Sequence, residues 1–263
     1  MLYRKLRLFQ GMVYRRLCHF LPAQMNIVGK MNVFLDSKYS LLHFGEVFAS
    51  RTYYPAIELF KAPPKSVLDL GAHQGFFTLL VESHMRQRFA GAKAEYTLYE
   101  ANPRMIKEIQ NNLAFAGMRK DQARIYCGAV GKRSGKADFK ICKYLDCSGI
   151  SPVFDVVKRI WAPYLDIEEN LEKDGIAAPQ LIKIDIEGSE VDLFENYERL
   201  FSKTCVVVAE FHEFNTFLEK WHSMVEMRGL QLYELTQDSG LSRVEIFINR
   251  SNLEAYNAGR PPL

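Results

Sequence analysis

Two short apolar runs of this chain end in side chains that could do chemistry. Asp185 and Glu187 come directly after the run 181–184, and His212 follows the run 205–210. Runs this short and apolar are typical of buried parallel strands, whose carboxyl ends form the ligand-binding edge of an α/β sheet. Carboxylates and an imidazole gathered at one edge can take a proton from a substrate or hold a divalent cation. The two runs therefore predict a reaction site at the edge of a sheet.

A glycine-punctuated turn follows an earlier apolar run, residues 66–70. Gly71 and Gly75 allow backbone conformations closed to other residues and let a ligand approach the main chain closely. A dinucleotide-binding turn would carry G-x-G-x-x-G for the pyrophosphate, whereas here the spacing is Gly71-x-x-x-Gly75, with Asp69 two residues before it. A helix is expected from the turn to about Phe89. This strand, turn and helix predict the first unit of a nucleotide-binding α/β sheet.

Two further strand ends extend the predicted binding site. The predicted strand 96–99 ends in Glu100, a position where an acidic residue accepts hydrogen bonds from ribose hydroxyls. Asn102 is expected to cap the helix that follows. The third predicted strand, 124–128, leads into a turn at 129–130, which we expect to pass the adenine.

Five motifs between Ser66 and about Glu213 give the chain a family resemblance. They are V-L-D-x-G-A-x-x-G-x-F-T at the first turn, E-x-N-P after the second strand, A-V-G after the third, K-I-D-x-E-G-x-E after the fourth and E-x-H at the end of the fifth. In these motifs the chain resembles the FkbM-type family of S-adenosylmethionine-dependent methyltransferases. One departure is His73, where the family pattern usually has Asn.

The resemblance implies an S-adenosylmethionine-dependent O-methyltransferase that acts on a hydroxyl of a sugar, a glycan or a polyketide-type natural product. It implies the α/β, Rossmann-like class I methyltransferase fold, a seven-stranded and mostly parallel sheet with helices on both faces. It also places His212, Asp185 and Glu187 at the transferred methyl group. The residues expected to bind the cofactor are Asp69, Gly71, Ala72, His73, Gly75, Phe76, Glu100, Ala101, Asn102, Ala129, Val130 and Asp185.

Methyl transfer from a sulfonium is an in-line displacement, so the protein must align donor and acceptor and relieve the acceptor hydroxyl of its proton. We expect a neutral His212 to be the base, with Asp185 or Glu187 orienting it or the acceptor. Lys183 lies two positions before Asp185 on the same strand face, and we expect it to pair with acids that would otherwise repel one another. An alternative, which we do not favour, is that Asp185, Glu187 and His212 hold a divalent cation that polarises sugar hydroxyls.

Residues 1–62 form an extension, expected to be helical, that lies mostly outside the resemblance. No acidic residue occurs from Met1 to Leu35, where basic and apolar residues are interleaved. This pattern favours a helix that packs on the main domain, and it leaves open a contact of residues 1–20 with an anionic membrane surface or a partner. Charges interrupt the apolar run, so we expect no signal peptide. A second helix is predicted near 54–60.

The rest of the chain is predicted to be a methyltransferase domain at 63–250, with a hairpin insertion at about 136–160, and a C-terminal tail at 251–263. The five cysteines are scattered and include no C-x-x-C pair, which favours a reducing cytoplasm over a disulfide framework or a zinc site. A net charge of +3 is too small to indicate nucleic acid by itself.

Other functions stay open at this level. An RNA methyltransferase could use the basic N-terminus, although enzymes that methylate amino groups of nucleic-acid bases often carry N/D-P-P-Y/F after strand four. A nicotinamide-dependent oxidoreductase could use the same sheet, although the expected G-x-G-x-x-G is absent. A non-catalytic binding protein is the third alternative.

Overall fold

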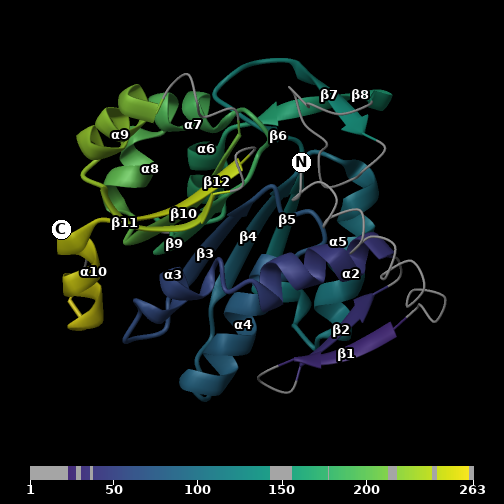
Figure 1. Ribbon diagram of the computed structural model, residues 1–263, viewed down its shortest axis with the longest axis horizontal. Coiled ribbons are helices and arrows are strands. Elements are labelled where there is room, and N and C mark those ends of the chain that lie inside the picture. Colours follow the sequence, from purple (N-terminus) through teal and green to yellow (C-terminus); the bar gives the residue numbers. More distant parts are fainter. Residues whose placement is uncertain are drawn as a thin grey trace.

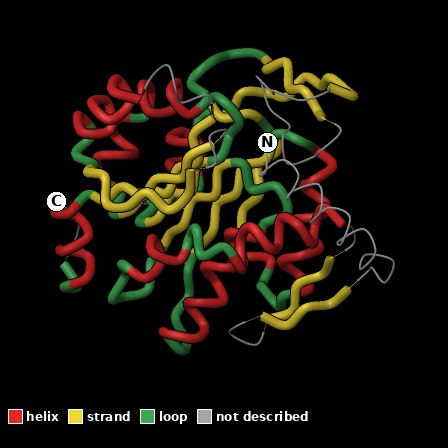
Figure 2. The backbone as a smooth tube through the Cα atoms, viewed as in Figure 1, coloured by secondary structure: helices red, strands yellow, loops and turns green. Residues whose placement is uncertain are grey.

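A seven-stranded sheet with helices on both faces forms the centre of the protein (Figures 1 and 2). A computed structural model describes residues 23–27, 31–35, 38–142, 156–176, 178–212, 218–238 and 242–260. Within this part of the chain, no helix is long and apolar enough to cross a membrane.

The sheet has the strand order β11-β12-β10-β9-β3-β4-β5, and β12 alone runs antiparallel to its neighbours. This is the predicted seven-stranded, mostly parallel sheet. The order reverses between β3 and β9, so the crevice at their carboxyl ends is the place where such sheets bind ligands. The strands are β3 (Ser66–Leu70), β4 (Glu95–Glu100), β5 (Ala123–Cys127), β9 (Leu181–Ile184), β10 (Val206–His212), β11 (Gln231–Asp238) and β12 (Ser242–Ile248).

Side chains of the central strands alternate between two hydrophobic cores, because successive residues of a strand point to opposite faces. Val67 packs into one core, while Leu68 and Leu70 pack into the other. The first core is covered by α4 (Phe76–Arg88), α5 (Pro103–Phe115) and the N-terminal extension, with η3 (Lys120–Gln122) before β5. The second is covered by α6 (Ile167–Lys173), α7 (Glu190–Asn196), α8 (Glu198–Lys203) and α9 (Leu218–Met227).

A hairpin lies in the region where the sequence predicts an insertion. Its strands are β7 (Lys136–Cys142) and β8 (Val156–Leu165), which pair antiparallel, and β6 (Ala129–Val130) runs parallel to β8. These strands form a small separate sheet beside the carboxyl end of β5 (Figure 1). The hairpin therefore stands near the turn predicted to pass the adenine.

The N-terminal extension is only partly the helical segment that the sequence predicts. Two antiparallel strands, β1 (Ala23–Ile27) and β2 (Met31–Leu35), precede α2 (Lys38–Phe44), a π-helix η2 (Gly45–Ala49) and α3 (Tyr54–Glu58). The prediction of helix up to Leu35 was wrong for β1 and β2. Met31, Val33 and Leu35 are buried while Phe34 is exposed, which is the two-residue period of a strand. Residues 1–22 lie outside the described part.

The C-terminal segment also differs from the expected tail, because residues Arg250–Asn257 form helix α10. Asn249 caps the helix by accepting a hydrogen bond from the Asn252 N–H at 3.1 Å. Leu253 is buried, and the Tyr256 hydroxyl donates to the Pro63 carbonyl at 2.6 Å. The helix thus closes the first core next to the residues that lead into β3.

Candidate active site

The glycine loop after β3 lies against the chain that leaves β9. Gly71 and Gly75 have φ values of 74° and 77°, in the left-handed region that favours glycine. A Cβ at Gly71 would stand 1.7 Å from the Asp185 carbonyl oxygen, so another residue does not fit there. The Gly71 and Ala72 N–H groups both donate to the Tyr99 carbonyl, at 3.0 and 2.9 Å. The loop therefore ties together the carboxyl ends of β3, β4 and β9.

Lys183 is the buried cation beneath this loop. Its ammonium lies 3.2 Å from the Asp185 carboxylate and 3.7 Å from that of Asp69, and it donates to the Gly71 carbonyl at 2.7 Å. Burial raises the pKa of Asp185, but Lys183 and His212 together outweigh burial and hold that pKa below its ordinary value. Asp69 is fully buried and accepts a hydrogen bond from the Thr78 hydroxyl at 2.8 Å. The predicted pairing of Lys183 with Asp185 is present, and Asp69 anchors the loop to α4.

Glu100 lies where the sequence predicts a ribose-binding carboxylate. Its two oxygens accept hydrogen bonds from the His73 N–H at 2.8 Å and the Asn102 N–H at 2.7 Å. Burial raises the pKa of Glu100 to about 6. Each carboxylate oxygen accepts more than one hydrogen bond, so ribose hydroxyls could still donate to it. The buried Asn102 Nδ2 has no partner among the described residues, and this unused donor also fits a ligand at this edge.

The other residues predicted to bind cofactor surround these strand ends. Asn102 accepts a hydrogen bond from the Arg104 N–H at 3.2 Å and so caps α5 as predicted. The roles of these predicted residues in cofactor binding stay predictions, but all of them lie at one edge of the sheet. The remaining ones are Ala72 and Phe76 around the glycine loop, Ala101 after β4, and Ala129 and Val130 in β6.

The structure adds His43 to this region, which the sequence did not indicate. Helix α2 brings its imidazole to the loop, where the Nδ1 atoms of His43 and His73 lie 2.8 Å apart. The two residues are 30 positions apart and no motif links them. The only possible sequence signal was His73 itself, at a position where the family pattern usually has Asn, because an imidazole needs a different hydrogen-bond partner from an amide.

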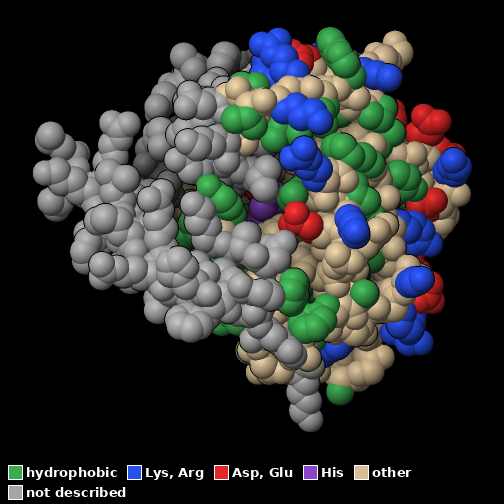
Figure 3. All heavy atoms as spheres, turned by 90° about the vertical axis from the view of Figure 1, so that its right-hand side faces the viewer, with side chains coloured by type: hydrophobic (Ala, Val, Ile, Leu, Met, Phe, Trp, Pro, Cys, Tyr) green, Lys and Arg blue, Asp and Glu red, His purple; other side chains and the backbone are tan. Residues whose placement is uncertain are grey.

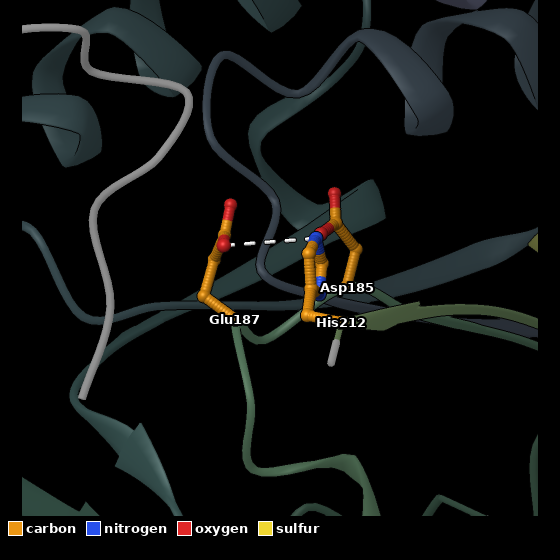
Figure 4. Close-up of side chains that lie close together, drawn as sticks. All are labelled: Asp185, Glu187 and His212. Carbon is orange, nitrogen blue, oxygen red and sulfur yellow. Dashed lines mark ion pairs between the residues drawn. The ribbon is translucent and has the colours of Figure 1, made fainter. Parts of the chain in front are cut away.

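A second group of side chains lies at the ends of β9 and β10. The His212 Nδ1 lies 3.1 Å from Glu190, and its Nε2 lies 3.6 Å from Glu187 and 3.8 Å from Glu210. Figure 4 shows Asp185, Glu187 and His212 pointing the same way, with a dashed line joining His212 to Glu187. Glu187 has a φ of 53°, so the backbone after β9 makes a tight turn to bring its carboxylate back to the imidazole. The predicted catalytic residues are therefore brought together.

The charges of this group differ from the sequence prediction. Burial opposes the charge of His212, but the hydrogen bond to Glu190 and the carboxylates of Glu187 and Asp185 outweigh it and raise its pKa to about 10. Burial also raises the pKa of Glu187 to about 8, against the effect of His212. The expectation of a neutral His212 was wrong for this arrangement, because the acids that surround the ring keep it protonated near pH 7.

Asp185, Glu187 and His212 also have the composition of a cation site. One potential ligand atom from each residue lies within 4.8 Å of the others. Carboxylate oxygens and an imidazole nitrogen suit several divalent cations. The geometry is therefore compatible with a bound divalent cation but does not require one.

Comparison with known proteins assigns this site to a family. The family model described as the methyltransferase FkbM domain matches residues 69–235, more than half of the chain. The chain belongs to this family. As an FkbM methyltransferase it is an S-adenosylmethionine-dependent enzyme, and the glycine loop with Glu100 fits that cofactor. Membership in a methyltransferase family favours methyl transfer over the nicotinamide-dependent oxidoreductase.

Among solved structures, the FkbM methyltransferase described here is similar to an FkbM methyltransferase from Methylobacillus flagellatus KT, with 17% identity and a TM-score of 0.48. That similarity covers 70% of this chain and 43% of the other, so this chain spans less than half of the length of its relative. It is also similar to magnesium protoporphyrin IX methyltransferase from Synechocystis PCC 6803 with bound S-adenosylmethionine, with 11% identity, a TM-score of 0.45 and 80% of each chain covered. A third is TrmK from M. capricolum with S-adenosylhomocysteine, with 8% identity, a TM-score of 0.45, and 77% of this chain and 68% of that one covered. No curated protein matches the chain.

Proposed function

We propose that this methyltransferase transfers the methyl group to a hydroxyl of a sugar, a glycan or a natural product. The observation that supports the proposal is the group of carboxylates around His212, at the same sheet edge as the glycine loop. Carboxylates accept hydrogen bonds, and a polyol offers several hydroxyl donors. An acceptor with neighbouring hydroxyls therefore complements this edge.

The charge of the same group argues against a nucleic-acid acceptor. Asp185 stays ionised at this edge, and an ionised carboxylate repels the phosphates of RNA. Figure 3 shows one face of the molecule, on which Lys and Arg side chains are scattered among hydrophobic and acidic ones. A neutral, hydroxyl-rich acceptor is the better fit.

Asp185, Glu187 and His212 have different roles in activating the acceptor hydroxyl. S-Adenosylmethionine, when bound, would supply the methyl group, with S-adenosylhomocysteine as the leaving group. Asp185, kept ionised by Lys183, orients the acceptor hydroxyl by accepting its hydrogen bond. Glu187 takes the proton of that hydroxyl as the new C–O bond forms, and its pKa of about 8 suits a base near neutral pH. His212, charged, holds Glu187 and Glu190 in place.

The cellular location and the partners of the N-terminal residues are inferred from the sequence. We infer a cytoplasmic location from the scattered cysteines, which suit reduced thiols. Residues 1–20, which lie outside the described part, are proposed to contact an anionic membrane surface or a partner protein.

The test is a labelled methyl-transfer assay. The protein is incubated with S-adenosylmethionine carrying a ¹³C methyl group and with panels of free sugars, glycolipids, polyketide-type alcohols and RNA, and products are analysed by mass spectrometry and NMR. A labelled methyl ether on a hydroxyl is the expected product. Label on RNA bases, or on amines alone, would overturn the proposal. The Glu187→Gln variant should abolish the product, whereas Glu172→Gln, at an exposed position of α6, should not.

A further inference from the structure

Two histidines from distant parts of the chain meet at the glycine loop. His43 lies in α2 of the N-terminal extension, and His73 lies between Gly71 and Gly75. Their Nδ1 atoms are 2.8 Å apart, with ring centroids separated by 4.5 Å and ring planes inclined by 72°. Since this distance is that of a hydrogen bond, one Nδ1 donates and the other accepts. The contact fixes the orientation of each ring and requires the two neutral rings to be opposite tautomers.

Helix α2 is held at this place by a buried polar network. The Gln74 side-chain amide donates to the Ser40 hydroxyl at 2.8 Å, and the Asn112 amide donates to the Gln74 carbonyl at 2.9 Å. The His43 ring also packs 5.0 Å from the ring of Phe76, the first residue of α4. The extension therefore contacts the cofactor loop and the start of α4 through Ser40 and His43, and does not merely cover the outer surface of the domain.

Both imidazoles are neutral in this setting. Burial lowers the pKa of His43 well below its ordinary value, and the nearby His73 adds to the effect. Burial likewise lowers the pKa of His73 to about 4. Two neutral rings share one Nδ1 proton, so the Nε2 of His73 accepts a hydrogen bond when His73 Nδ1 is the donor, and donates one when His73 Nδ1 is the acceptor.

That Nε2 atom is buried, and no described residue offers it a hydrogen bond. A buried polar atom without a partner costs stability unless a ligand or water satisfies it. His73 lies between two fixed points of the site: its N–H donates to Glu100, and the charges of Asp185 and Lys183 act on its ring. A cofactor that reaches from the ribose carboxylate to the methyl edge passes this position with its methionine part.

We propose that His73 binds the charged amino-acid end of S-adenosylmethionine through Nε2, and that His43 is the positioning residue that holds the His73 ring for this contact. The N-terminal extension is then a working part of the cofactor site. This also accounts for histidine where the family pattern usually has Asn. The imidazole is longer than an amide and has two nitrogens, so a second residue must engage Nδ1 to fix what Nε2 presents.

The test compares two ligands by calorimetry, S-adenosylhomocysteine and 5′-methylthioadenosine, because the second lacks the amino-acid end. His73→Phe should weaken S-adenosylhomocysteine binding about ten- to hundredfold, as expected for a hydrogen bond to a charged group. His43→Phe keeps a ring against Phe76 but removes the Nδ1 contact, and should weaken it about three- to tenfold. Neither variant should change the affinity for 5′-methylthioadenosine. The double variant should behave as His73→Phe alone, because His43 acts only through His73.

The control variant is His84→Phe. His84 is also buried, and its ring contacts Tyr54 of the extension at 4.8 Å, but it lies outside the loop. It should lower the melting temperature without changing the ratio of the two affinities. In the wild type, ¹⁵N NMR of the histidine rings should show the His73 Nε2 resonance shifting with S-adenosylhomocysteine and not with 5′-methylthioadenosine.

The proposal is overturned if the His43 and His73 variants weaken both ligands equally, or neither, or if the His73 Nε2 resonance does not respond to the amino-acid end. NMR of the wild type decides the question even if a variant fails to fold. No acceptor is present in these measurements, so an error in the proposed hydroxyl acceptor would leave their outcome unchanged.

Discussion

Replacing Lys183 by Met should destabilise the protein more than any exposed charge change, because Lys183 is the buried cation that the strand ends share. Its side chain is 6% exposed, and the carboxylates of Asp69 and Asp185 lie 3.7 and 3.2 Å away. Methionine fills most of the volume but offers no charge. The variant leaves the carboxylates of Asp69 and Asp185 without their shared cation below the glycine loop. It also removes the hydrogen bond that Lys183 donates to the Gly71 carbonyl.

The size of the effect follows from burial. Removing one partner of a buried ion pair costs about 3–5 kcal/mol, because the other charge stays unpaired. Asp69 is 1% exposed and cannot recover solvation, whereas Asp185 is 25% exposed and recovers part of it. We therefore expect a loss of about 3–4 kcal/mol in the free energy of unfolding. For a chain of this size, that loss lowers the melting temperature by roughly 6–16 °C.

The loss should depend on pH. In the wild type, the lowered pKa of Asp185 gives stability that is present above its ordinary value of 3.8 and is lost as the pH falls through the folded-state pKa. Burial already raises the pKa of Asp69 in the wild type, and the loss of Lys183 raises the pKa of both Asp69 and Asp185, so the folded variant takes up protons before the unfolded state does. The stability of the variant then rises as the pH falls toward 4. The difference between the two proteins should be largest at neutral pH and shrink on acidification.

The assay is urea unfolding and calorimetry at several pH values, with Lys132→Met as the control. Lys132 pairs with Glu168 at 2.7 Å, but both side chains are partly exposed, so its loss should cost less than about 1 kcal/mol. A Lys183→Met loss as small as that of the control, or one independent of pH, would refute the argument. It would mean that water already reaches Asp69.

Three further predictions concern the cofactor and the reaction. Glu100→Gln should weaken S-adenosylhomocysteine binding by about 1–3 kcal/mol in calorimetry, and the wild-type affinity should fall below pH 6 as Glu100 takes up a proton, whereas a variant affinity equal to wild type would contradict the ribose role. Glu187→Gln should lower kcat about a hundredfold to ten-thousandfold and abolish the rise of kcat toward pH 8. If the variant keeps this pH profile, another group is the general base. Chelation by EDTA should leave the rate unchanged, whereas a loss restored by Mg²⁺ would assign Asp185, Glu187 and His212 to a cation.

Local pattern was sufficient to predict the sheet and the loop. Short apolar runs mark buried strands, and the spacing of Gly71 and Gly75 after one of these runs marks a turn in which both glycines have a positive φ. The pairing of Lys183 with Asp185 was also predictable, because residues two apart on a strand share a face. These features depend on neighbours in the chain, and the sequence displays neighbours directly.

Features that depend on distant contacts were not predictable. The basic, apolar stretch before Leu35 fits a helix as well as a strand until Met31 and Val33 are seen packing into the first core. The contact of His43 with His73 needs α2 to cross the loop, which no spacing reveals. The pKa of His212 depends on Glu190 from α7 reaching its Nδ1, and the sequence shows that acid without showing its direction.

Asp185 and Glu187, the two carboxylates at the reaction edge, differ in whether they pair with Lys183 and in the direction of their pKa shift. Asp185 lies within 3.2 Å of the ammonium, which keeps its pKa low and its charge fixed. Glu187 is two residues further along, faces His212 instead, and has a pKa raised by burial into the range where protons exchange near neutral pH. One acid can therefore hold a hydroxyl while the other accepts its proton, although both follow the same strand. Lys183→Met should therefore disturb this division as well as the fold, because it raises the pKa of Asp185 toward that of Glu187 and leaves the acceptor without a permanently charged partner.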